Sequence, residues 1–119
     1  MSYAHVGFAV KDLAVSKKFY EAALAPVGIT LISEGENWAA FGKEGRNLLW
    51  IGTFGPVPGH IHFAFEASDR SSVDAFYKAA IAAGGKDNGA PGIRENYSPT
   101  YYAAFVIDPD GHNVEVVAR

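Results

Sequence analysis

Two stretches of the sequence are copies of one pattern: residues 4–28 read AHVGFAVKDLAVSKKFYEAALAPVG, and residues 61–85 read IHFAFEASDRSSVDAFYKAAIAAGG. Aligned without gaps, they are identical at 9 of 25 positions, including His5 with His62. A repeat of this kind indicates that one supersecondary unit occurs twice. Because 119 residues suffice for one ordinary domain, we expect both copies to share a single domain, residues 1–119.

Each copy shows the same order of local signals. Alternating apolar residues predict a first strand, and Asp12 or Asp69 then stands where a carboxylate caps a helix. Glycine follows each helix as a stop signal. In the second copy, the stretch after the helix reads KDNGAPGIREN and is loop-like. The strands expected are 4–10, 30–34, 37–41 and 47–52 in the first copy, and 61–67, 100–107 and 113–117 in the second.

These signals predict an α+β protein built from two β-α-β-β-β units. The first unit spans residues 1–52 and the second spans residues 60–119, while the Gly- and Pro-rich segment 53–59 is typical of a linker. Each unit alone leaves one sheet face in need of cover. We therefore expect the units to pair, within the chain or across a dimer, into a curved eight-stranded mixed sheet that encloses a metal-centred cavity.

Composition excludes several classes of protein. The net charge is −3 with no basic stripe, which argues against nucleic acid as a partner. The absence of cysteine excludes disulfides, thiolate metal sites and a cysteine nucleophile. The apolar stretches are too short to span a bilayer, and the N-terminus lacks the pattern of a signal peptide. We expect a cytoplasmic protein without membrane contacts.

Strand alternation decides which polar side chains share a sheet face. His5 and His62 occupy duplicated positions, so both are expected to point into the central cavity. Glu115 lies among valines in the last strand, where a carboxylate is costly unless it is paired or bound. An isolated strand histidine is more often a core or surface residue, but the duplication favours ligands here. Two imidazoles and a carboxylate suit Fe(II), Mn(II), Zn(II) or Ni(II), with positions open for substrate oxygens.

Other residues are candidates for catalysis or substrate binding. Glu66 shares a face with His62 and is the first candidate for a general acid or base; the alternative interpretation is a surface salt bridge. Tyr101 shares a face with Phe105 and is the second catalytic candidate, with core packing as its alternative. The loop PGIRENYSPT is a possible lid, or simply a solvated loop. The expected substrate-binding residues are Arg94, Tyr97 and Phe105.

Three segments carry a family resemblance: the opening YAHVGFAV, the helix DLAVSKKFYEAAL and the ending DPDGHNVEVV. Together they resemble the vicinal oxygen chelate superfamily, which includes lactoylglutathione lyase, fosfomycin-modifying thiol transferases, extradiol dioxygenases and bleomycin-binding proteins. The resemblance covers nearly the whole chain. It implies paired βαβββ units and a substrate that chelates one divalent metal ion through two adjacent oxygens. The ligands it implies are His5, His62 and Glu115.

The sequence departs from each subfamily of that superfamily. Lyases and epimerases usually have a fourth ligand on the last strand of the first unit, where the repeat alignment places Leu49 and directs Trp50 toward the helices. Dioxygenases and thiol transferases typically have a tyrosine ten residues before the final glutamate, where Phe105 stands. Thiol transferases also favour threonine at the position of Gly7. The reaction therefore stays open between lyase or isomerase chemistry and ring-cleaving oxygenation.

The sequence thus predicts a glyoxalase- or dioxygenase-like metalloenzyme with a small-molecule substrate. The alternative is a non-catalytic protein of the bleomycin-resistance type, which binds a drug or another aromatic molecule. The retained ligands favour the enzyme, and no residue speaks for a structural or regulatory domain. The resemblance also implies a homodimer. If the units pair across it, His5 of one chain meets His62 and Glu115 of the other; if they pair within one chain, all three come from the same copy.

Overall fold

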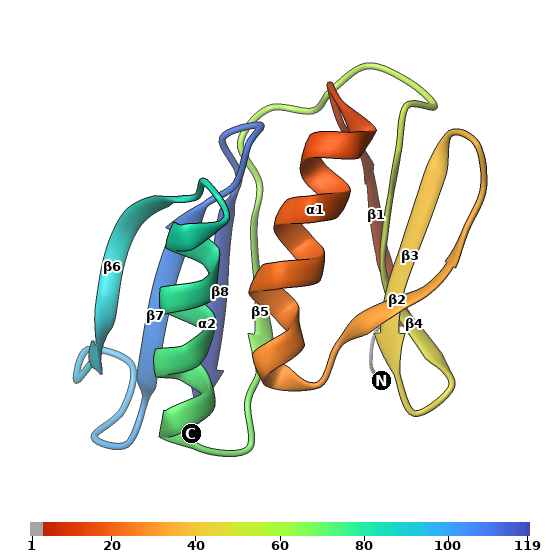
Figure 1. Ribbon diagram of the computed structural model, residues 1–119. Coiled ribbons are helices and arrows are strands. Elements are labelled where there is room, and N and C mark those ends of the chain that lie inside the picture. The colour runs from red at the N-terminus through yellow and green to blue at the C-terminus, as the bar shows by residue number, and fades with distance from the viewer. Residues whose placement is uncertain (1–3) are drawn as a thin grey trace.

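The computed structural model describes residues 4–119, which form two modules of the same design (Figure 1). Each module runs from one strand through a helix to three further strands. The first contains β1 (Val6–Ala9), α1 (Leu13–Leu24), a short 3-10 turn (Ala25–Val27), β2 (Thr30–Glu34), β3 (Trp38–Lys43) and β4 (Arg46–Gly52). The second contains β5 (His62–Glu66), α2 (Arg70–Ala82), β6 (Lys86–Ile93), β7 (Tyr102–Ile107) and β8 (Asn113–Ala118).

The strands form two sheets of identical topology. The first sheet has the order β1-β4-β3-β2 and the second has the order β5-β8-β7-β6. In each, the opening strand pairs in parallel with the last strand, and the remaining pairs are antiparallel. The α+β class and the two βαβββ units are confirmed. The eight strands are divided between two sheets, because β1 and β5 each pair along one edge only.

The helix starts follow the sequence signals. The Asp12 carboxylate accepts a hydrogen bond from the Val15 backbone N–H at 3.2 Å, and Asp69 accepts from the Ser72 N–H at 2.8 Å. These bonds satisfy backbone donors that have no partner inside the helix. Gly28 follows the first helical segment at φ +81°, a conformation that only glycine adopts without strain.

One apolar core joins both modules. α1 and α2 contact each other and lie on the same side of the two sheets, as Figure 1 shows. Phe19 and Tyr20 of α1 and Phe76 of α2 are fully buried in this core. Each sheet therefore has an inner face against the helices and an opposite face, called the outer face below. Burial of the inner faces holds the modules together and leaves the outer faces for other contacts.

The strand that the loop-like stretch 86–96 obscured in the sequence is the edge strand β6, which spans residues 86–93. Its pairing with β7 shifts register between Asp87 and Gly89 and again between Gly89 and Gly92. Glycine and proline such as Pro91 are uncommon in strands, so this segment does not look like one in the sequence. An edge strand tolerates both, because one side of its backbone makes no hydrogen bonds to a neighbouring strand.

The strand pairings also correct the repeat alignment over the last strands. Gly7 pairs with Trp50 in the first sheet, and its counterpart Ala64 pairs with Glu115 in the second. Trp50, and not Leu49, is therefore the counterpart of Glu115. The expectation that Trp50 packs under the helices was also wrong: Leu49 is fully buried on the inner face, whereas Trp50 lies on the outer face and is 40% exposed.

The error has a simple physical cause. The triplet Ala-Ala-Phe occurs in β3 and in β7, and matching these letters shifts the strands by one residue. Phe41 belongs to the core on the inner face, whereas Phe105 lies in a small cluster on the outer face. A shift of one residue in a strand reverses the face of every side chain.

A buried polar contact joins the modules at the turn before β8. The Tyr20 hydroxyl donates to Oδ2 of Asp108, and both side chains are buried. Oδ1 of Asp108 accepts from the backbone N–H groups of Asp110 and His112, each at 2.9 Å. Burial, reinforced by the Asp108 charge, raises the pKa of Tyr20 well above its usual value. The contact fixes the turn that leads into the strand bearing Glu115.

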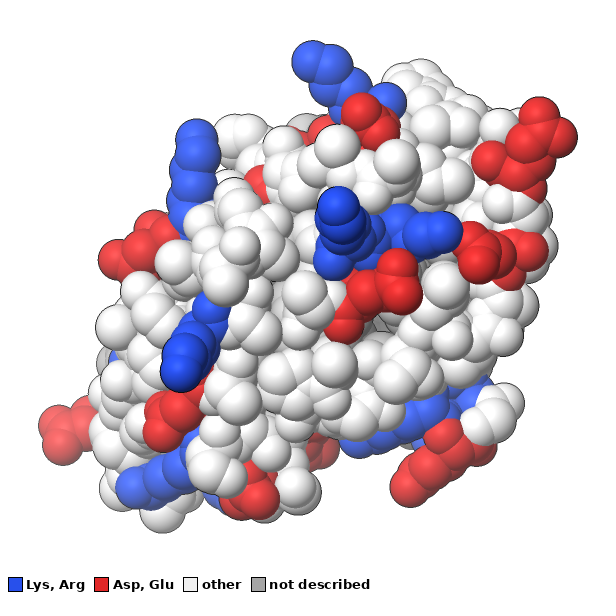
Figure 2. Space-filling view, viewed as in Figure 1, with Lys and Arg blue, Asp and Glu red and all other residues white. Residues whose placement is uncertain are grey.

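Charged side chains of both signs are spread over the face drawn in Figure 2. Lysine and arginine side chains there lie interspersed with aspartate and glutamate. Among residues 4–119, no helix combines the length and the apolar character that a membrane span requires.

Candidate functional site

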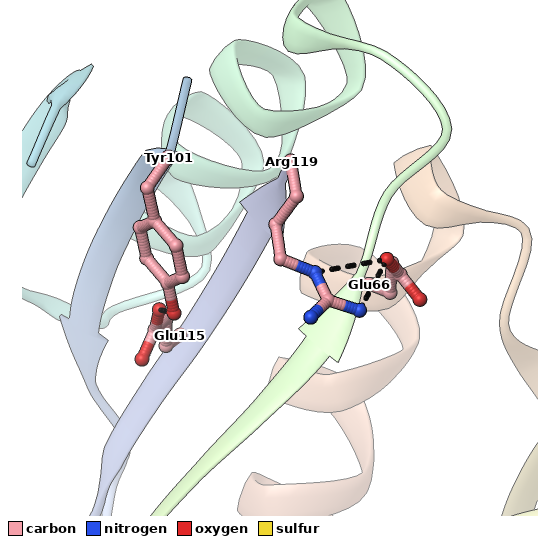
Figure 3. A network of polar contacts seen from close by, with 4 residues as sticks. All are labelled: Glu66, Tyr101, Glu115 and Arg119. Carbon is pink, nitrogen blue, oxygen red and sulfur yellow. Dashed lines mark hydrogen bonds and ion pairs between the residues drawn. The ribbon is translucent and has the colours of Figure 1, made fainter. Parts of the chain in front are cut away.

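Glu115 is the centre of a polar cluster on the outer face of the second sheet. Its side chain is only 3% exposed. Nε2 of His62 lies 2.7 Å from Oε1 of Glu115. The Tyr101 hydroxyl donates to Oε2 at 2.5 Å, and Figure 3 shows the ring pointing at the carboxylate. Because β5 pairs in parallel with β8, the imidazole from one strand reaches the carboxylate on its neighbour.

The environment of Tyr101 defines its role in this cluster. Burial of the hydroxyl, together with its hydrogen bond to Glu115, raises the pKa of Tyr101 to about 12. The phenol therefore stays protonated near neutral pH and acts as a hydrogen-bond donor. Its contact fixes one carboxylate oxygen and leaves the other directed at His62.

The three residues expected to bind substrate surround this cluster. Phe105 pairs with Glu115 in the sheet register, and its ring centroid lies 6.1 Å from that of His62. The Arg94 guanidinium covers the Phe105 ring at 5.2 Å from the centroid and donates to the Ala90 carbonyl at 2.7 Å. Tyr97 packs on Tyr101, with ring centroids 4.8 Å apart. The loop after β6 thus reaches the outer face beside Glu115.

Glu66 lies on β5 beyond the histidine and pairs with Arg119. Oε2 of Glu66 accepts from Nη2 of Arg119 at 2.8 Å and from Nε at 3.2 Å (Figure 3). Both side chains are more than 60% exposed, so the ion pair contributes little to stability. This contact matches the alternative interpretation of Glu66 as a surface salt bridge, and it leaves the carboxylate accessible.

His5 lies just before β1, the edge strand of the other sheet. Its ring is 6.5 Å from that of Trp50, between centroids. A cleft of about 640 Å³ between the two sheets is lined by His5 and by His62, so both histidines border one space. Within residues 4–119, however, no three histidine, aspartate or glutamate side chains lie close enough to hold one ion. A single chain therefore brings together His62 and Glu115 but not His5.

The pair of His62 and Glu115 fits a divalent metal ion in its chemistry. An imidazole nitrogen and a carboxylate oxygen are ligands that Fe, Mn, Zn and Ni accept. Metal bonds of about 2.1 Å place neighbouring donors roughly 3 Å apart, close to the 2.7 Å between Nε2 and Oε1. A carboxylate that binds a metal is usually held by a further hydrogen bond from the protein, and the Tyr101 hydroxyl makes such a bond to Oε2 of Glu115.

Sequence analysis missed two aromatic residues on the outer face of the first sheet. The ring centroids of Trp38 and Trp50 are 5.1 Å apart, and their planes are inclined by 46°. Trp38 pairs with Gly52 and Trp50 pairs with Ala40, which places both indoles on the face that bears His5. Their position could have been predicted by following the alternation of faces from His5 along β1 and then across to β4, its parallel partner.

Comparison with known proteins agrees with this architecture. Residues 2–116 match the Glyoxalase/Bleomycin resistance protein/Dioxygenase superfamily. No curated protein matches the chain.

Solved structures share the fold over nearly the full length. A glyoxalase/bleomycin resistance protein from Albidiferax ferrireducens T118 is 31% identical, with a TM-score of 0.83 and 98% of each chain covered. A putative glyoxalase from Bacillus halodurans is 24% identical, with a TM-score of 0.73 and coverage of 98% of this chain and 94% of that one. A lactoylglutathione lyase from Agrobacterium tumefaciens is 20% identical, with a TM-score of 0.71 and coverage of 98% and 92%. The chain thus belongs to the Glyoxalase/Bleomycin resistance protein/Dioxygenase superfamily.

Proposed function

We propose that the protein is a metal-dependent enzyme of the glyoxalase type, acting on a small substrate that binds one divalent metal through adjacent oxygens. His62 and Glu115 of one chain would hold the ion together with His5 of a second copy. The reaction is a lyase or isomerase reaction, or a ring-cleaving oxygenation. A homodimer in the cytoplasm is part of this proposal.

The pairing of the buried Glu115 with an accessible histidine supports the proposal best. Taking a carboxylate out of water is costly unless a partner compensates it. Glu115 has two such partners, and one of them, His62, has a side chain that is 52% exposed. The imidazole can therefore turn toward a ligand while Tyr101 holds the carboxylate in place. A purely structural carboxylate would not need an exposed partner.

The need for a second copy follows from the position of His5. The histidines occupy duplicated positions and border one cleft, but within residues 4–119 His5 does not join His62 and Glu115 in a group that could hold an ion. A symmetric dimer can place the first sheet of one copy against the second sheet of the other, which forms two equal sites.

The chain itself supplies the groups that would handle substrate. A metal ion bound here would act as a Lewis acid toward the substrate oxygens. Glu66, on the same strand as His62 and accessible to solvent, is the candidate for proton transfer. Arg94, held over the Phe105 ring, would face negative charge on the substrate, and Tyr97 would cover the site. Tyr101 would keep Glu115 oriented.

A second function is favoured by the indoles on the first sheet. Trp38 and Trp50 form an aromatic surface suited to sequestering a drug-like molecule without reaction. A sequestering protein would bind its aromatic ligand equally well after metal removal, whereas an enzyme of the proposed type would lose productive binding.

Elemental analysis of purified protein tests the proposed site. We expect about one divalent ion per chain in the parent, and far less in His62→Ala and Glu115→Gln. His60→Ala is the matched control, because His60 lies just before β5 and outside the cluster, and it should retain the metal. Equal trace metal in all four proteins would contradict the site and favour the sequestering function.

A further inference from the structure

The cleft between the two sheets extends well beyond the histidines that border it. It lies where the opening strands β1 and β5 face each other, and within residues 4–119 neither strand pairs on that side. Its lining includes Ile29 and Phe65, which are buried members of the core shared by both modules. Glu115 and Tyr101 do not contribute to the lining. The cleft is therefore a space between the modules, distinct from the polar cluster on the outer face.

Apolar side chains from both modules form one wall of this cleft. Val6 and Leu48 come from the first module and Phe63 from the second, and all three are half-buried beside the core. Filling the space beside them with an apolar group is favourable, because it removes apolar surface from water. β5 borders the cleft along its whole length, from His62 to Glu66, which is roughly 13 Å for a strand. The wall thus suits an elongated apolar chain.

Two cationic side chains border the same cleft. Lys43 and Arg46 flank the turn between β3 and β4 and are paired with each other in the strand register. Within residues 4–119, neither forms an ion pair. Like charges that lie opposite each other on adjacent strands repel, and an anion bound between them relieves that repulsion. The planar fork of an arginine also matches the two oxygens of a carboxylate.

The remaining charges around the cleft do not offset these cations. Among the described residues that line it, Glu66 alone is acidic, and Arg119 pairs with its carboxylate at 2.8 Å. Lys43 and Arg46 therefore give the cleft a positive charge beside its apolar wall. A ligand that fits both features has an apolar tail and one anionic head group.

We infer that this cleft binds a medium-chain alkyl carboxylate, with its tail along β5 and its head group between Lys43 and Arg46. The cleft volume of about 640 Å³ lies in the range of small-molecule sites, about 300–1,000 Å³. The inference goes beyond the proposed function and does not depend on it, because neither the tail nor the head group requires a metal ion.

Isothermal titration with three ligands tests the tail and the head group separately. Octanoate carries both, butanoate has the same carboxylate on a short tail, and octanol has the long tail without the charge. We expect one octanoate per chain, and binding at least about tenfold weaker for butanoate and for octanol. EDTA treatment of the protein should leave these affinities unchanged. In methyl NMR spectra, octanoate should shift the signals of Val6, Ile29 and Leu48, which line the cleft.

A pair of double variants locates the head group. Lys43→Gln/Arg46→Gln should weaken octanoate binding about tenfold and leave octanol binding unchanged. Lys18→Gln/Lys78→Gln is the matched control, because it makes the same change in net charge at exposed helix positions outside the cleft. The control should bind octanoate like the parent.

The outcomes separate this site from the proposed metal site. Octanoate binding by a protein that holds no metal would support the cleft and contradict the metal site. Equal affinities for octanoate and octanol, equal losses in the two double variants, or unshifted methyl signals of Val6, Ile29 and Leu48 would overturn the inference. Loss of octanoate binding after EDTA treatment would assign the carboxylate to a metal ion and would overturn it as well.

Discussion

The two sheets have the same strand order and the same histidine at the same position, but their outer faces differ in chemistry. In the second sheet, Glu115 pairs with Ala64, the counterpart of Gly7, and it is hydrogen-bonded to Tyr101 and His62. In the first sheet the equivalent residue is Trp50, stacked on Trp38. The duplicated scaffold fixes where side chains lie, and the residue at one register position decides whether a face carries a carboxylate or an indole.

The inner faces show the opposite behaviour. Leu49 and its counterpart Val114 are both fully buried and apolar, because both pack against the helices in one core. Core positions are held to apolar residues by burial, whereas outer positions are free to diverge. Substitutions at equivalent inner and outer positions should therefore have unlike effects.

The largest effects are expected when a carboxylate is introduced on the inner face or on the outer face of β4. Leu49→Glu buries a charge without a partner and should lower the free energy of unfolding by at least about 3 kcal/mol. Trp50→Glu places the carboxylate on the outer face beside His5, copying the second sheet, and should leave the fold intact. It should tighten Ni(II) binding roughly tenfold by adding a ligand.

Chemical denaturation and Ni(II) titration of the two variants check this contrast. A stable Leu49→Glu protein with tightened Ni(II) binding would mean that the register derived for β4 is incorrect. Unchanged affinity in a folded Trp50→Glu protein would place position 50 away from the metal.

A smaller effect is expected when the support of Glu115 is removed. Tyr101→Phe deletes the hydroxyl that donates to Oε2 and leaves the rest of the ring in place. Metal affinity should fall by about 10- to 100-fold, because the carboxylate loses the contact that orients it. Tyr102→Phe is a suitable control, since the Tyr102 hydroxyl bonds to Asp74 on the helix side. Equal losses in both variants, measured by isothermal titration, would argue against a specific role for Tyr101.

The smallest expected effect is a dependence of stability on alkaline pH. The pKa of Tyr101 is raised from 10.0 to about 12 in the folded chain, so the folded state holds this proton more tightly than the unfolded state. The resulting stabilisation is fully present below pH 10 and is lost as the pH rises through 12. The difference in unfolding free energy between the parent and Tyr101→Phe should therefore shrink over that window and stay constant at lower pH. A constant difference up to pH 12 would contradict the raised pKa.

Much of the fold was predictable because its signals are local. Asp12 and Asp69 cap the helices as predicted, and the duplicated order of strands and helices follows from the repeat. β6 was not predictable from local signals, since an edge strand is stabilised by its neighbour despite glycine and Pro91. The prediction for β4 was wrong for a different reason. Aligning the two Ala-Ala-Phe triplets by identity placed β4 one residue out of register and so assigned its side chains to the wrong faces.

The candidate site was predictable only in part. Alternation along β5 and β8 correctly placed His62 and Glu115 on one face, and it placed Tyr101 with Phe105 beside them. The loop after β6 was expected near the site and does reach Phe105 through Arg94. His5 was expected beside His62 and Glu115, but the structure leaves it outside their cluster, next to Trp50. In the proposed function, a second copy would supply it.

The most direct test of a site shared by two copies is complementation between His5→Ala and His62→Ala. Each variant alone should bind almost no Ni(II), because both of its sites lack a ligand. After the two are unfolded together and refolded, random pairing gives mixed dimers with one intact site, and Ni(II) binding should recover to about a quarter of the parent's capacity. No recovery, with mixed dimers demonstrated by native mass spectrometry, would contradict a site built from His5 of one copy and His62 with Glu115 of the other.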